Sequence, residues 1–444
     1  MKNQQRPGVT ALTFEPDPML TCRTLHAPDK QDVVIVGAGP VGLLAAKFLA
    51  ELGFFVHVLE KNINTETTNN CRTINLSISP RGLKALRAAG LETEFKDIAL
   101  PMDSRATHRK GRPISLTKYG KNSWFNYSVE RSQLHKLLLK SAKETRNVSI
   151  CLNSECINID NSQKKNNVTY IQAGKKNTLE ADAVIGADGA KSITRSLMAK
   201  RNSFKHQFSL IDSTYKEITI KEKNDSWAID PGAIHIWPRK DFFMIALPNL
   251  NHSFRANLFL PSMGKISFSS LDSPKKIEDF LKAQFPDIYP FIKESGSEIL
   301  EKQQGYVFKA ECDRYVFRNN ILLIGDAAHA IVPFMGQGVN LGFEDCQFLF
   351  DTLKKYSNNL DQTFQKFNDD RQPEGFAANV LSERNYQELT DAKTSLFNLT
   401  VKAVIPIIRR LFPSLLPPPA ITMVNFLDLS YSEVLKKINQ RHFF

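Results

Sequence analysis

The stretch DVVIVGAGPVGLLAAKFLAELGFFVHVLEK, residues 32–61, decides the fold. Two apolar strands, Val33–Val36 and Phe55–Leu59, flank a helical pattern over residues 43–52. The turn between the first strand and the helix carries the glycines of a GxGxxG motif, which are Gly37, Gly39 and Gly42. Glu60 follows the second strand directly. Strand, glycine turn, helix, strand and acid in this order predict a dinucleotide-binding unit.

The residue types of this unit suit the chemistry of a nucleotide. Glycines let the backbone approach a pyrophosphate, and the helix N-terminus offers partial positive charge. The carboxylate of Glu60 can accept hydrogen bonds from ribose hydroxyl groups. An ordinary strand–helix–strand turn without a ligand is the structural alternative.

A second motif lies far along the chain, in LLIGDAAHAIVPFMGQGVNLGFEDC, residues 322–346. An apolar strand ends at Gly325, Asp326 follows, and a glycine-rich loop around Gly336 leads into a helical pattern. A third short motif, GADG, contains Asp188. One fingerprint at the start and glycine–acid motifs far from it predict one cofactor held by distant parts of the chain, and that cofactor is FAD.

Composition excludes several classes of protein. The 444 residues are 42% hydrophobic and 23% charged, which indicates a globular rather than a disordered or fibrous chain. The net charge of +12 is dispersed and accompanies no nucleic-acid-binding motif, so we expect no nucleic-acid partner. Six cysteines without metal-ligand spacing predict reduced thiols and no metal site.

Changes in pattern along the chain divide it into four parts. Residues 1–30 form a loose extension, and 371–444 form a C-terminal helical region. A discontinuous FAD-binding domain takes in 31–100, 126–205 and 306–370, and a substrate-binding β-sheet domain takes in 101–125 and 206–305. The apolar stretch 399–419 is interrupted by charges and prolines, so it is either a helix packed on the body or a weak membrane-surface segment.

Together the three motifs, GAGPVG with its acid, GADG and GDAAHAIVPFMGQGVN, resemble the single-component FAD-dependent aromatic hydroxylases. The resemblance implies an α/β fold, with a Rossmann-like FAD-binding domain, an inserted antiparallel β-sheet domain for the substrate and the helical region at the C-terminus. It also implies that NADPH binds transiently, without a second nucleotide-binding domain.

The resemblance assigns further residues to FAD. Asp326 would hydrogen-bond the ribityl chain, and the loop Gly336–Gln337–Gly338 would approach the isoalloxazine ring. The remaining residues that we expect at the cofactor are Arg72, Arg131, Asp188 and Asn340. We interpret His329 as a packed or hydrogen-bonding loop residue, with a proton donor as the alternative.

Within this family the chain resembles the kynurenine 3-monooxygenase group, through INLSISPRGLKAL, PMDSRATH, IHIWPRKDFFMIALPN, RNYQEL and TMVNF. The resemblance implies that Arg105 and Tyr119 bind the α-carboxylate of the substrate and that Asn385 joins them. Glu388 lies one helical turn after Asn385, on the same face. A guanidinium with neutral donors suits an amino-acid carboxylate in a closed pocket.

Two positions depart from the group's pattern. Ile421 stands where the group has a tyrosine that binds the substrate carboxylate, and Met335 stands beside the flavin loop where a phenylalanine is usual. A lost hydroxyl donor to a buried carboxylate costs roughly 1.5–3 kcal/mol of binding. The substrate is therefore less firmly predicted than the cofactor.

The implied reaction is hydroxylation of L-kynurenine at the ring 3-position by O2, with NADPH as reductant and a flavin C4a-hydroperoxide as the oxygen donor. The alternatives are hydroxylation of another aromatic acid and a flavoprotein of the same fold that does not hydroxylate. Eukaryotic members of the group carry a hydrophobic C-terminal anchor, whereas this chain ends at RHFF. We therefore expect a cytoplasmic protein of the bacterial type.

Overall fold

The computed structural model describes residues 31–63, 75–120, 124–200, 204–293, 295–390 and 418–440. The expected N-terminal extension, the expected cofactor residue Arg72 and nearly all of 399–419 lie outside these ranges. Within them, no helix is both long and apolar enough to cross a membrane. The cytoplasmic location stays a prediction.

The first sheet has six strands in the order β18-β19-β12-β1-β2-β8. Their bounds are β1 (Asp32–Val36), β2 (Phe55–Leu59), β8 (Val148–Cys151), β12 (Ala183–Gly186), β18 (Val316–Phe317) and β19 (Ile321–Leu323). All pairs are parallel except β18 with β19. Every residue of β1, β2, β12 and β19 is buried, as is usual for parallel strands that helices cover on both faces.

Helices from several parts of the chain accompany this sheet, and α1 contacts both α4 and α9. They are α1 (Pro40–Glu51), α2 (Pro80–Ala88), α3 (Glu92–Asp97), α4 (Arg131–Glu144), α5 (Ile193–Ala199), α8 (Asp326–His329) and α9 (Gly338–Lys355). The order β1, α1, β2 confirms the predicted nucleotide-binding unit.

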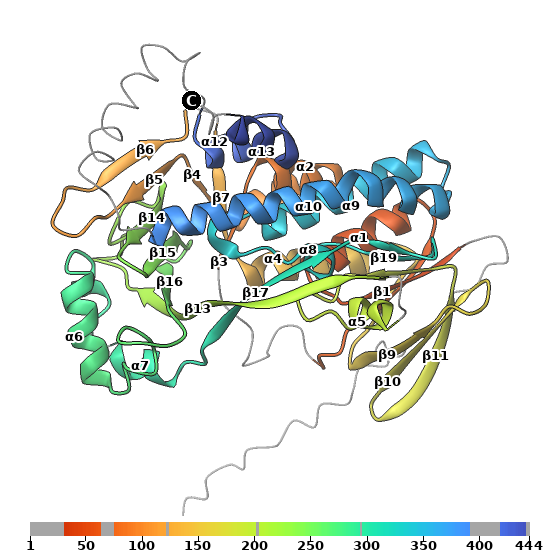
Figure 1. The fold of residues 1–444 in the computed structure, drawn as a ribbon, viewed down its shortest axis with the longest axis horizontal. Coiled ribbons are helices and arrows are strands. Elements are labelled where there is room, and N and C mark those ends of the chain that lie inside the picture. The colour runs from red at the N-terminus through yellow and green to blue at the C-terminus, as the bar shows by residue number, and fades with distance from the viewer. Residues whose placement is uncertain are drawn as a thin grey trace, which may run out of the picture.

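The second sheet has seven strands in the order β17-β13-β16-β15-β14-β5-β6. Their bounds are β5 (Ser104–Thr107), β6 (Ser115–Lys118), β13 (His206–Ile220), β14 (Ala233–Pro238), β15 (Phe243–Pro248), β16 (Phe254–Leu260) and β17 (Gly305–Cys312). A separate core forms where this sheet meets α6 (Pro274–Gln284), η2 (Tyr289–Phe291) and α7 (Gly296–Glu301). Figure 1 shows the long strand β13 running from this sheet toward the opposite end of the molecule.

Strand β14 serves both faces of the second sheet. Ile234 and Ile236 point to one face, whereas Trp237 packs in the core beside α6 on the other. On that side His108 hydrogen-bonds His235 at 2.8 Å and Asp287 at 2.7 Å. Because successive side chains of a β-strand point to opposite faces, β14 presents apolar side chains on one face of the sheet and packed, hydrogen-bonded side chains on the other.

Two small sheets complete the strands. One has the order β3-β7-β4, with β3 (Asn75–Ile78), β4 (Ala99–Met102) and β7 (Asn126–Glu130). The other has the order β11-β10-β9, with β9 (Ser154–Asp160), β10 (Asn166–Gln172) and β11 (Lys175–Ala181).

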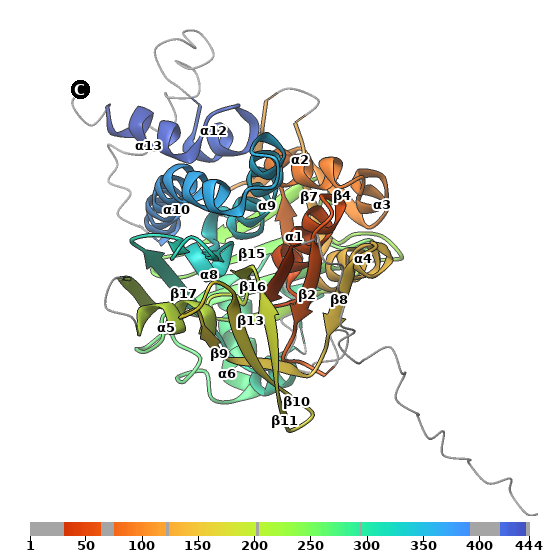
Figure 2. The ribbon, with the colours of Figure 1, turned by 90° about the vertical axis from the view of Figure 1, so that its right-hand side faces the viewer.

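The C-terminal part is helical, with α10 (Leu360–Thr390), α12 (Ala420–Phe426) and α13 (Tyr431–Asn439). Figure 2 shows α12 and α13 gathered beside α9 and α10, on one side of the molecule. Arg81 in α2 holds them there, because its guanidinium donates to the backbone carbonyls of Val424 and Leu429 and pairs with Glu344 at 2.8 Å.

The predicted α/β class, with its nucleotide-binding sheet, second sheet and C-terminal helices, is confirmed, but three details need correction. The second sheet is not purely antiparallel, since β5 and β14 pair in parallel. Strand β17, which we assigned to the FAD-binding part, pairs with β13 in the second sheet. The expected boundary at residue 370 falls inside α10.

Of the described cysteines, Cys156, Cys312 and Cys346 are free, but Cys151 is disulfide-bonded, so reduced thiols were wrongly predicted there.

Asp345 in α9 joins three segments. It is fully buried, and its Oδ2 accepts hydrogen bonds from the Gly325 backbone N–H at 2.9 Å and from His329 Nε2 at 2.6 Å. Its Oδ1 accepts from Arg371 Nε at 2.8 Å. Burial raises the pKa of this carboxyl, but the charges of His329 and Arg371 outweigh burial and hold the net pKa below its usual value. The ionised carboxylate thus links the turn after β19, α9 and α10.

Replacing Asp345 by asparagine should destabilise the protein strongly, because the buried Arg371 loses the nearer of its two charged partners. We expect the free energy of unfolding to fall by about 3–5 kcal/mol, measured by urea unfolding followed through tryptophan fluorescence. The exposed Asp351 on the same helix is the matched control. Asp351→Asn should change the free energy of unfolding by no more than about 0.5 kcal/mol, and equal losses in the two variants would contradict the assigned role.

Candidate functional site

A cavity of about 350 Å³ lies between the two large sheets and is bordered by residues of α10 and α12. Its lining comes from the glycine turn before α1, from β3, β5, β13 to β17, from the loop before α9, and from α10 and α12. The polar side chains on its wall are Asn75, Ser77, Arg105, Tyr119, Asn126, Arg131, Tyr215, Asn257, Tyr306, Asp326, Asn385 and Asn425. Segments far apart in the sequence therefore build one site.

The glycine turn packs too tightly for larger residues. A Cβ on Gly42 would lie 2.0 Å from the carbonyl oxygen of Gly37, and a Cβ on Gly37 would lie 2.6 Å from that of Ala187. Gly37 also has a φ of +105°, which favours glycine. Gly39 differs, because it lines the cavity and a Cβ there meets no protein atom within 4 Å. The first N–H groups of α1 receive no side-chain cap, so they stay available to a ligand.

The carboxylates of Glu60 and Asp188 accept hydrogen bonds from protein groups near this turn. Glu60 Oε2 accepts a hydrogen bond from the Ala38 N–H at 2.9 Å, and Oε1 accepts from Asn62. Asp188 Oδ2 accepts from Thr194, whereas its buried Oδ1 has no partner among the described residues. Neither carboxylate lies on the cavity wall itself.

The loop of the second motif reaches the cavity through its backbone. Asp326, Gly336 and Gly338 line the cavity, and Gly338 is the first residue of α9. The N-termini of α1 and α9 thus both border the same space, and their partial positive charges suit a phosphate and the reduced flavin ring. Arg131, at the start of α4, also lines the cavity.

The side chains of Gln337 and Asn340 serve the loop rather than the cavity. Gln337 is only 2% exposed, donates to Asn425 Oδ1 at 2.7 Å and accepts from Tyr431 Oη at 3.0 Å. Asn340 donates to the carbonyls of Ser77 and Gly336. The predicted approach of Gln337 to a flavin therefore concerns its backbone, while its side chain ties the loop to α12 and α13.

Arg105 marks the other end of the cavity. Its Nε is buried without a hydrogen-bond partner, and it forms no ion pair with any residue in the described ranges. Burial lowers the pKa of this guanidinium, and the nearby Tyr119 and Glu388 only partly offset that effect. A buried cation without an anion is costly, so this end of the cavity suits an anionic ligand.

Tyr119 stands beside Arg105 and contacts the C-terminal part. Burial raises the pKa of its hydroxyl to about 12, so it stays protonated and can donate. Its ring lies 4.9 Å from that of Phe426, which in turn stacks on Trp124 at 5.1 Å. The end of α12 therefore packs directly on the proposed carboxylate site.

The remaining predicted substrate residues are only partly brought together. Asn385 and Met335 line the cavity, and Asn385 Nδ2 donates to the Phe334 carbonyl at 2.8 Å. Glu388 is exposed on α10 and acts on Arg105 through its charge, without lining the cavity. Ile421, the departure noted in the sequence, also lies on the wall.

Sequence reasoning missed the floor of the cavity. Its apolar residues are Ile234, Ile236, Ile245, Leu247 and Phe259, which alternate along β14, β15 and β16. Asn257 lies among them. The sequence predicted a β-sheet domain over residues 206–305, but not which face of the sheet helices would cover and which would face the cavity. His329 is a packed, hydrogen-bonded residue as predicted, held by Asp345.

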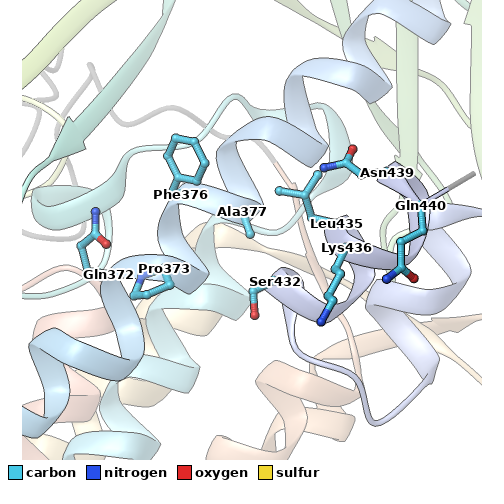
Figure 3. Close-up of a pocket in the computed structure, with 9 residues that line it drawn as sticks. All are labelled: Gln372, Pro373, Phe376, Ala377, Ser432, Leu435, Lys436, Asn439 and Gln440. Atoms are coloured by element: carbon cyan, nitrogen blue, oxygen red, sulfur yellow. The ribbon is translucent and has the colours of Figure 1, made fainter. Parts of the chain in front are cut away.

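A second hollow lies on the surface between α10 and α13 and has a volume of about 750 Å³. Figure 3 shows Phe376, Ala377 and Pro373 along α10 facing residues of α13 such as Lys436. Phe376 is 53% exposed. Among the described residues that line it, Lys436 alone is charged.

Two glycine variants separate folding from cofactor binding. Gly39→Ala should keep the thermal unfolding temperature of the flavin-free protein but lose bound flavin, because its methyl group enters only the cavity. Gly42→Ala should lower both, since its methyl group collides with the Gly37 carbonyl. The ratio of flavin to protein absorbance after gel filtration, with a thermal melt, tests both. Full flavin content in Gly39→Ala would contradict the placement of the cofactor.

Comparisons with known proteins agree on one family. Residues 30–377 match the model of the FAD binding domain family. The kynurenine 3-monooxygenase of Cytophaga hutchinsonii is 36% identical over 92% of this chain and 91% of its own length. That of Sus scrofa is 32% identical over 91% of this chain and 86% of its own length.

Solved structures support the fold at lower identity. A 2-methyl-3-hydroxypyridine-5-carboxylic acid oxygenase variant matches with a TM-score of 0.68 at 20% identity, over 84% of this chain and 96% of its own. A tetracycline destructase matches with a TM-score of 0.61 at 16% identity, over 88% and 99%. The two-sheet architecture and the cavity between the sheets are thus placed in a known fold, and by sequence the chain belongs to the kynurenine 3-monooxygenase family of FAD-binding-domain proteins.

Proposed function

We propose that this protein hydroxylates L-kynurenine at the ring 3-position, using FAD, NADPH and O2. The observation that carries the proposal is the partly buried Arg105, whose Nε has no hydrogen-bond partner among the described residues, on the wall of a largely apolar cavity that is also lined by glycine loops. An aromatic amino acid has the matching charges, with a carboxylate at one end and an apolar ring at the other.

The residues fit FAD at the glycine end. Gly39, Gly336 and Gly338 leave backbone exposed to the cavity, and the N-termini of α1 and α9 border it. Asp326 and Arg131 add a carboxylate and a guanidinium on the same wall. FAD bound there and reduced by NADPH would supply the oxygen-activating chemistry.

The chain's own part in the reaction is to bind, orient and enclose the substrate. Arg105 would pair with the α-carboxylate, and the protonated Tyr119 hydroxyl would donate to it. Asn385 lines the same cavity and keeps Phe334 in place. The apolar floor made by Ile236, Ile245 and neighbours would hold the ring and exclude water, which protects a reactive oxygen donor.

The proposal is tested by anaerobic stopped-flow reduction of the bound flavin by NADPH, with and without L-kynurenine, followed by oxygen and mass analysis. We expect kynurenine to accelerate reduction and the product to be one oxygen atom heavier. Arg105→Gln should weaken kynurenine binding about 10- to 100-fold, because a charge-assisted hydrogen bond is lost.

Arg109 is exposed and lies in the loop between β5 and β6, so it provides a matched control for Arg105. Arg109→Gln should leave kynurenine affinity within about twofold, since exposed charges interact weakly in water. A flavin-loaded enzyme whose reduction ignores kynurenine would contradict the substrate, and an unchanged affinity in Arg105→Gln would contradict the carboxylate site.

Ile421 favours a second candidate, hydroxylation of another aromatic acid. Its side chain lines the cavity and offers no donor to a carboxylate. A substrate that needs less polar recognition at this end would suit the site better than kynurenine. Screening aromatic acids for accelerated flavin reduction would identify it.

The variant Ile421→Tyr distinguishes the two candidates. If kynurenine is the substrate, the added hydroxyl should strengthen its binding by up to about tenfold, as one new hydrogen bond to a charged group allows. Titration of the flavin absorbance measures this affinity, and Ile421→Phe controls for the added ring. Equal affinities in the tyrosine and phenylalanine variants would show that no carboxylate lies within reach of position 421.

A further inference from the structure

Asn257 is a polar side chain set in the apolar floor of the cavity. It lies on β16, is 4% exposed and lines the cavity. Ile245 stands directly opposite on β15, and Phe259 follows on the same face of β16. Its Oδ1 has no hydrogen-bond partner among the residues that the structure describes.

A buried amide oxygen without a partner is costly, so such atoms in folded proteins usually bind water or a ligand. An asparagine also has low preference for strands, where it packs poorly. The same position filled by leucine would complete the floor. The retained amide therefore points to a ligand group that donates a hydrogen bond.

The sheet register places Asn257 far from Arg105. Arg105 pairs with Ile234 on β14, whereas Ile236 on β14 pairs with Ile245, which pairs with Asn257. Three strand spacings separate the two backbones, or roughly 14 Å. The long arginine side chain shortens this gap. The two groups therefore suit opposite ends of a molecule with a carboxylate at one end and an N–H donor at the other.

We infer that Asn257 accepts a hydrogen bond from the ring amino group of the substrate and sets the orientation of the ring. This inference rests on the proposed function, because L-kynurenine carries such an amine. One N–H of that amine can bond the neighbouring ketone, and the other is left for the protein. With the carboxylate held at Arg105, a fixed amine fixes which ring carbon beside it is offered for hydroxylation. Asn257 is thus a residue that determines specificity.

The test compares L-kynurenine with its analogue that lacks the ring amine, 2-amino-4-oxo-4-phenylbutanoic acid. Equilibrium titration of the flavin absorbance gives a Kd for each ligand. We expect the wild-type protein to bind kynurenine about tenfold more tightly than the analogue, and Asn257→Leu to bind the two about equally. Asn257→Ala should show the same loss of preference if the leucine variant does not fold.

Turnover gives a second measurement. In Asn257→Leu the amount of hydroxylated product per NADPH oxidised should fall, because a misoriented ring leaves reduced flavin to react with oxygen unproductively. Ile245→Val is the matched control, since it alters the same part of the floor without touching a polar group. It should change the two Kd values by the same factor.

The results distinguish a failure of the role inferred for Asn257 from a failure of the proposed function. If Asn257→Leu keeps the wild-type preference for the amine, the role of Asn257 is overturned and the proposed function stands. If the flavin-loaded wild-type protein binds neither ligand, the proposed function and this inference are both overturned.

Discussion

One buried carboxylate, that of Asp345, holds together the parts of the chain that meet behind the flavin loop. It fixes the Gly325 N–H and so the turn that presents Asp326 to the cavity. Through Arg371 it also fixes α10, the helix that carries Asn385. Asp345 therefore supports both the proposed cofactor end and the proposed substrate end of the cavity. A change in packing around Asp345 would shift residues at both ends.

Local patterns predicted the elements of the FAD-binding part well. The expected strand Phe55–Leu59 is β2, and the expected strand Val33–Val36 falls within β1. These strands are short and buried on both faces, so each can be recognised in the sequence as a continuous apolar run. The cofactor and the family followed from motifs whose spacing is fixed by backbone geometry, and the comparisons confirm both.

Long-range pairings could not be predicted in this way. We assigned the residues of β17 to the FAD-binding part, but this strand pairs with β13 in the second sheet. Gln337 looked like a flavin contact, yet its side chain bonds Asn425 and Tyr431, which lie far along the chain. Asn257 belongs to no sequence motif, and only the strand register and the cavity lining show that it faces the cavity. Such facts depend on which strands and helices become neighbours after folding.

The cavity has two kinds of wall. The proposed flavin end is built from the backbone of loop glycines such as Gly39, Gly336 and Gly338, and Gly336 has a φ of +67°, which favours glycine. The substrate end is built from side chains that project from a regular sheet, such as Ile245 and Asn257, together with Ile421 from α12. Single substitutions can reshape that second wall without moving a strand. Evolution is therefore free to redirect this enzyme to new aromatic substrates through point mutations while its oxygen chemistry is inherited unchanged.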